Sequence, residues 1–95
     1  MAKEKELIER NIELSTEFSR YIFEHPELET IIPLGAEILF LPDFDPELKN
    51  YNLELGKKLE VNGTKIFYVR ITRLRPKVFS RIEEISLGEN ITGRT

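Results

Sequence analysis

The fold of this chain is decided by residues 36–74, which read AEILFLPDFDPELKNYNLELGKKLEVNGTKIFYVRITRL. The run 36–41 is short, mostly apolar and followed by a proline, which is typical of a buried strand. The run 64–74 is rich in β-branched and aromatic residues and predicts the longest strand of the chain, ended by the proline at 76. Between them, the DPE motif at 45–47 starts a helix and the NG pair at 62–63 ends it.

A strand, a helix and a second strand joined by short loops form a βαβ unit. The loops here have about three residues, so the two strands are expected to be parallel with a right-handed crossover. Residues 88–95 are polar and contain glycine, which predicts a disordered tail. We therefore expect an α/β fold in a single domain over residues 1–87.

An amphipathic helix is predicted over residues 4–24, ahead of the βαβ unit. Its apolar side chains recur at three- and four-residue spacing, and Pro26 ends it near His25. Residues 26–32 suit a short helical turn. Three apolar residues fall on the flank of the stripe, so the apolar arc is wider than one core needs. We expect these three, Ile8, Ile12 and Phe23, to contact a second subunit.

The segment 78–87 (VFSRIEEISL) is ambiguous. The spacing of Ile82 and Ile85 suits a helix, whereas the β-branched residues and the position of the segment favour a strand. We predict an edge strand here, which gives a sheet of two or three strands. So thin a sheet needs cover on its edges, and a partner subunit would supply it.

Composition excludes several classes of function. The 95 residues contain no cysteine and one histidine, which excludes disulfides, thiolate catalysis and multi-histidine metal sites. No cofactor is expected. The first twenty residues do not fit a signal peptide, and no apolar stretch is long enough for a bilayer, so we expect a cytoplasmic protein without a membrane partner. The many charges and the absence of Gln and Trp resemble heat-adapted proteins.

Charge is distributed in blocks along the chain. Residues 1–56 hold 13 acids and 5 bases, a net charge of −8, whereas residues 57–81 hold 8 bases and one acid, a net charge of +7. Phe67 and Tyr68 lie within the basic block, and a basic strand with aromatic residues is one way to bind single-stranded nucleic acid. The simpler interpretation pairs this block with the acidic helices, inside the fold or across a homodimer. A pI near 5.3 argues against a dedicated nucleic-acid binder.

Charged residues also follow both predicted strands at their carboxyl ends, where open parallel sheets bind ligands. Asp43 and Asp45 follow the first strand, and an Asp pair suits a divalent cation in a metal-dependent enzyme. Arg73 and Arg75 end the second strand and, with Arg70, suit an anion such as phosphate or carboxylate. The simpler interpretation is that Asp45 caps the following helix and Asp43 pairs with an arginine. We assign no catalytic residue and no metal site.

Two asparagines lie within or beside the apolar stripes of the two long helices. A buried amide without partners costs about 1–3 kcal/mol, so we expect Asn11 and Asn52 to bond loop backbone or to fix the register of the helices. His25, between a helix end and a proline, is interpreted as a cap of the last helical carbonyls.

Three stretches of the chain resemble a family of small prokaryotic proteins classed as a domain of unknown function. They are ERNIELSTEFSRYIFEHPEL (9–28), GAEILFLPDFDPELKNYNLELGKKL (35–59) and FYVRITRL (67–74). The resemblance spans residues 9–87 and implies a single-domain protein with no assigned activity or catalytic residues. Our hypothesis is a non-enzymatic binding or assembly protein that forms a homodimer or binds an unidentified protein. The alternatives are binding of an anionic ligand or nucleic acid through the basic strand, and a metal-dependent enzyme.

Overall fold

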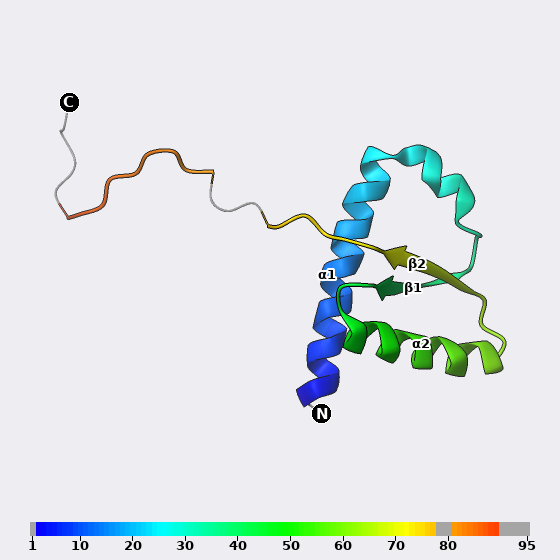
Figure 1. Ribbon diagram of the computed structural model, residues 1–95. Coiled ribbons are helices and arrows are strands. Elements are labelled where there is room, and N and C mark those ends of the chain that lie inside the picture. The colour runs from blue at the N-terminus through cyan, green and yellow to red at the C-terminus, as the bar shows by residue number, and fades with distance from the viewer. Residues whose placement is uncertain (1, 78–80, 90–95) are drawn as a thin grey trace.

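The computed structural model describes residues 2–77 and 81–89 of the chain (Figure 1). The elements in chain order are α1 (Ala2–Glu24), η1 (Pro26–Ile31), β1 (Glu37–Pro42), α2 (Pro46–Val61) and β2 (Ile66–Ile71), of which η1 is a 3-10 helix. Strands β1 and β2 pair in parallel, with α2 between them in the chain. The predicted α/β class and its βαβ unit are confirmed.

Local signals set both ends of α2 where the sequence placed them. The Asp45 side chain accepts a hydrogen bond from the Leu48 backbone N–H at 3.2 Å, which satisfies one of the free donors of the first turn. At the other end Gly63 adopts a φ of 88°, and its N–H donates to the Glu60 carbonyl. This left-handed backbone cannot continue a right-handed helix, and glycine adopts it without the strain that a side chain would bring.

Strand β2 is shorter than predicted. It has six residues, as β1 has, instead of the eleven expected over 64–74. The register pairs Glu37 with Ile66 and Pro42 with Ile71, so each strand ends where its partner ends. After Pro42 the chain turns into the loop that starts α2, so residues 72–77 have no neighbouring strand in the sheet.

The two faces of the sheet meet different elements. Leu39 and Tyr68 face α2, and they approach it so closely that a Cβ on Gly56 would lie 3.2 Å from Leu39 Cδ1 and collide with the Tyr68 hydroxyl. Ile38 and Phe40 point to the opposite face because side chains alternate along a strand. There Phe18 of α1 packs edge-to-face on Phe40, with ring centroids 5.6 Å apart.

The buried core is small for a chain of this length. Among the described residues the buried side chains of the hydrophobic core come from α1, β1 and α2; these are Leu7, Leu14, Leu39, Phe40 and Leu48. No residue of β2 is fully buried. Within the described ranges no helix combines the length and the apolar character that crossing a membrane requires.

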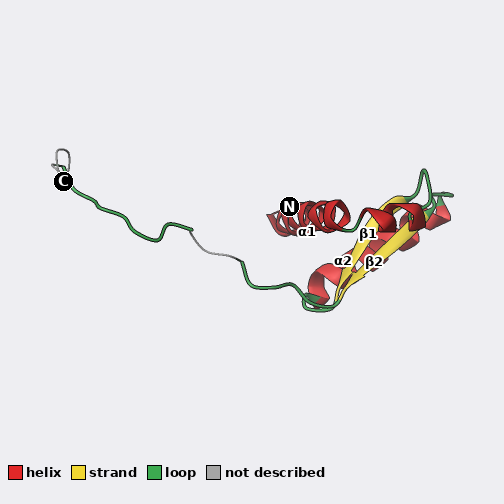
Figure 2. Cartoon of the chain, turned by 90° about the horizontal axis from the view of Figure 1, so that it is seen from above, coloured by secondary structure: helices red, strands yellow, loops and turns green. Residues whose placement is uncertain are grey.

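The predicted third strand does not form in the part of the segment that the structure describes. Residues 81–87 are irregular and exposed, and they lie far from the helices and strands (Figures 1 and 2). The sheet formed by the described residues has two strands, β1 and β2, and residues 81–87 do not reach its edges. Residues 78–80 of the predicted strand, and residues 90–95 of the predicted disordered tail, lie outside the described residues.

Candidate functional site

Asp43, one of the predicted ligand residues, forms ion pairs with two cations of its own chain. Its Oδ1 lies 3.0 Å from Lys49 Nζ, and its Oδ2 lies 2.9 Å from Arg70 Nη2. The hydrogen bond from Arg70, and then that from Lys49, lowers the pKa of Asp43 from its ordinary value. The same contact raises the pKa of Arg70. Asp43 thus links the end of β1 to both β2 and α2.

Asp45 both caps α2 and binds Arg10 of α1. Arg10 Nη1 lies 2.9 Å from Asp45 Oδ2, and Arg10 Nη2 lies 2.9 Å from Glu47 Oε1. Hydrogen bonds to Glu47, and then to Asp45, raise the pKa of Arg10. The hydrogen bonds from Arg10, and then from Lys3, lower the pKa of Glu47. The sequence prediction missed Arg10; the available signal was the pair of carboxylates at the start of α2, which attract a guanidinium from a helix packed there.

The structure does not bring the predicted arginines together around an anion. Arg70 lies in β2 and is bound to an aspartate, whereas Arg73 and Arg75 follow β2 on an exposed segment. The aromatic residues of this strand also separate, because alternation places Tyr68 toward α2 and Phe67 toward the opposite face. The two rings therefore do not form one stacking platform beside the arginines.

The remaining titratable candidates do not cluster either. Within the described ranges no three or more His, Asp or Glu side chains are placed to hold a metal ion. The imidazole of His25 stacks on Tyr21 with centroids 4.3 Å apart, and its Nδ1 lies 3.8 Å from Glu27 Oε2. The predicted cap is made by the backbone of His25, whose N–H donates to the carbonyl of Tyr21 at 2.9 Å and to that of Ile22 at 3.1 Å in the last turn of α1.

The two asparagines form a reciprocal amide pair between α1 and α2. Asn11 Nδ2 donates to Asn52 Oδ1 at 2.9 Å, and Asn52 Nδ2 donates to Asn11 Oδ1 at 2.8 Å. Asn52 is fully buried and also donates to the backbone carbonyl of Phe40 at 2.8 Å. The pair joins the two helices, which is the geometry that a register role requires, whereas the backbone that Asn52 bonds belongs to strand β1 and not to a loop as predicted.

The outer edge of β1 is only partly closed by this pair. The N–H of Glu37 donates to Lys65 O at 2.8 Å and that of Asp43 donates to Ile71 O at 2.9 Å, so odd-numbered residues of β1 point toward β2. The N–H and C=O groups of Ile38 and Phe40 therefore point to the outer side. There the Asn52 side chain donates to the Phe40 carbonyl. The N–H and C=O of Ile38 face the space between α1 and α2.

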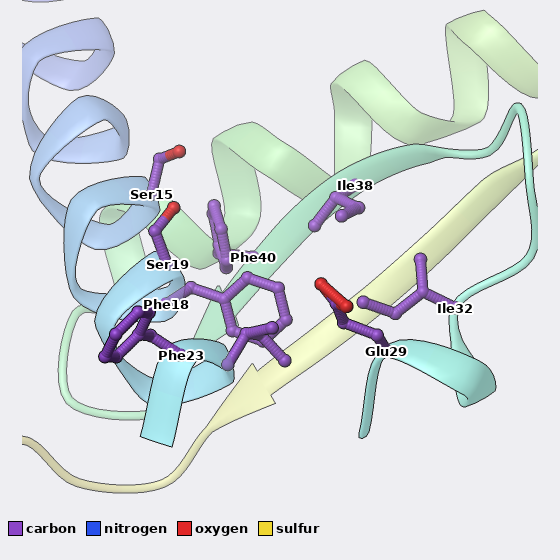
Figure 3. A pocket seen from close by; sticks show the side chains of 9 residues that line it. Ser15, Phe18, Ser19, Phe23, Glu29, Ile32, Ile38 and Phe40 are labelled. Carbon is purple, nitrogen blue, oxygen red and sulfur yellow. The ribbon is translucent and has the colours of Figure 1, made fainter. Parts of the chain in front are cut away.

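Two adjoining hollows lie beside this edge, and we call them together the edge groove. The first, of about 460 Å³, lies between α1, η1 and the face of β1 that carries Ile38 and Phe40 (Figure 3). The second, of about 260 Å³, lies between α1, β1 and α2 and includes Leu39 on the opposite face. Ser15, Ile38 and Phe40 line both hollows, so the groove wraps around the β1 edge.

The three residues predicted to contact a second subunit all line the edge groove. Ile8 and Ile12 line the second hollow and Phe23 lines the first. Their exposed fractions are 46%, 60% and 87% respectively. Apolar side chains gathered around an open strand edge can bind an extended apolar segment, with main-chain hydrogen bonds to the edge and side chains in the hollows.

Comparisons with known proteins agree with the resemblance of the three stretches. No curated protein and no solved structure matches the chain. Residues 6–85 match the Family of unknown function (DUF5647), a range that contains the whole βαβ unit and most of α1. The chain belongs to this family of unknown function.

Proposed function

We propose that this chain is a non-enzymatic assembly protein of the cytoplasm that forms a homodimer through the edge groove. The observation that carries the proposal is the open outer edge of β1 with apolar side chains on both sides of it. Exposed strand edges and apolar patches are surfaces that proteins cover by pairing with another chain.

The charged residues support the same proposal. Asp43 and Asp45, which an enzymatic or ligand-binding role would need free, are bound to cations or backbone of the same chain. Both aspartates therefore connect elements within the chain. The edge groove is then the surface that a partner would cover.

Substitution of one groove residue tests the proposal. Ile12→Asp places a charge in the second hollow, and we expect it to weaken self-association at least about tenfold, because burying an isoleucine contributes about 1.5–3 kcal/mol. Leu34→Asp is the matched control, since Leu34 is 98% exposed and lies in the loop before β1. Sedimentation equilibrium measures the dissociation constant. Equal effects of the two substitutions would contradict the proposal.

A further inference from the structure

Resting on the proposed homodimer, we propose which element of the second copy occupies the edge groove. It is helix α1, which packs antiparallel to α1 of the first copy across a two-fold axis near Ser15. In this arrangement each α1 covers the outer edge of β1 in the other copy.

A stripe of side chains on α1 faces the edge groove along most of the helix. Its members recur at spacings of four, three, four and three residues, which places them on one side of a helix, as in helices that pack on another helix. All of them line one hollow or both, and we call them the α1 seam: Ile8, Ile12, Ser15, Ser19 and Ile22. The seam contains no charge, and it lies beside the stripe that enters the core, which includes Leu7, Leu14 and Phe18.

The α1 seam is complementary to itself when the two helices run antiparallel. With the axis at Ser15, Ile8 meets the partner's Ile22. In the same register Ile12 lies against the partner's small Ser19, and Ser15 meets the partner's Ser15. Bulky side chains thus lie at the two ends of the contact and small ones at its centre, where two helix axes can approach to about 8 Å.

Charges beside the seam are complementary in the same register. Lys5 and Glu9 are exposed, and neither forms an ion pair with any residue that the structure describes. Glu9 comes opposite the partner's Arg20, on the flank of the seam that faces solvent. Lys5 comes opposite the partner's His25, within a stretch (21–31) that contains three glutamates and no lysine or arginine. Opposite charges around an apolar contact fix the orientation and register of two helices.

The helix pair also covers the open strand edge. Ser15 and Ser19 lie on the side of α1 that faces β1, so a helix packed on the seam runs over the mouths of both hollows (Figure 3). A helix laid over a strand edge is one of the ways in which proteins protect such edges. Phe23, which is 87% exposed, lies at the end of the seam and is buried against the first turns of the partner's α1. The contact uses the same surface twice and closes as a two-fold dimer.

A disulfide at the two-fold axis tests the arrangement, because the natural chain has no cysteine and a single substitution can link only two copies. Ser15→Cys places the two thiols on either side of the axis, within the range that a disulfide spans. Glu13→Cys is the matched control on the same helix, since Glu13 is exposed and lies about 160° around α1 from Ser15. We expect mild oxidation to link Ser15→Cys at least about ten times more than Glu13→Cys, since proximity sets the yield.

A charge exchange tests the register by sedimentation equilibrium. Glu9→Arg should weaken the dimer about threefold to tenfold, because two opposite-charge contacts per dimer become like-charge contacts. Adding Arg20→Glu should restore the dissociation constant to within about twofold of the natural value. A double variant as weak as Glu9→Arg alone would overturn the register.

The same measurements separate this inference from the proposed function. Equal cross-linking of the two cysteine variants, with a natural chain that is dimeric, refutes the pairing of the two α1 helices and leaves the homodimer intact. A monomeric natural chain refutes both.

Discussion

Replacement of the buried asparagine at the β1 edge is the sharpest test of how the fold is held together. Asn52→Ala removes three hydrogen bonds, two to Asn11 and one to the Phe40 carbonyl. The Phe40 carbonyl loses its donor, which costs about 1–3 kcal/mol. The loss of the amide pair adds only about 1 kcal/mol, because water can hydrogen-bond to the half-buried Asn11 in its place. We expect the free energy of unfolding to fall by about 2–4 kcal/mol, a large part of the total for a small domain.

Urea denaturation followed by circular dichroism, at one fixed protein concentration, measures this loss. Asn11→Ala should cost about 1–3 kcal/mol, because it leaves Oδ1 of the buried Asn52 without its donor. The double variant should cost at least about 1 kcal/mol less than the sum of the single ones, because the two amides share their bonds. Asn50→Ala, at an exposed position of α2, is the matched control and should change stability by less than about 0.5 kcal/mol. Equal losses for Asn52→Ala and Asn50→Ala would refute the reasoning.

Two other substitutions test the contacts around the sheet. Alanine is the better helix former by about 1 kcal/mol, yet Gly56→Ala should lower stability by about 1–3 kcal/mol, because its Cβ would collide with the Tyr68 hydroxyl. Tyr68→Phe added to it should recover part of the loss in the same denaturation assay; a stabilised Gly56→Ala chain would contradict the close approach. Asp43 has a lowered pKa in the fold, so its ion pairs stabilise the fold above its unfolded pKa of about 3.9 and are lost as pH falls through the lower folded value. Thermal unfolding of the natural chain against Asp43→Asn should therefore show a difference at neutral pH that vanishes in acid, and a difference independent of pH would count against it.

Features with local signals could be predicted from the sequence. Helix α2 begins and ends where the DPE and NG motifs place it, because capping depends on residues a few positions apart. That Asn11 and Asn52 would need hydrogen-bond partners was also predictable, since both amides lie within or beside apolar stripes. Their mutual bond was not, because it depends on how the two helices cross.

Features set by distant contacts could not be predicted. The length of β2 depends on where its partner β1 ends, which a β-rich composition does not reveal. Arg10 pairs with residues 35 and 37 positions away, so its role follows from packing of α1 on α2. The edge groove likewise exists only because α1, η1 and α2 stand around one strand edge, although three of its lining residues stood out in the sequence as excess apolar positions.

The oligomeric state of the natural chain tests the central claim most directly. Native mass spectrometry of the purified protein at about 10 µM would detect a dimer with a dissociation constant of about 1 µM or tighter. The open edge of β1 and its apolar groove predict a bare dimer. A monomer at this concentration would contradict the account, and so would a small molecule retained in the groove of a monomer.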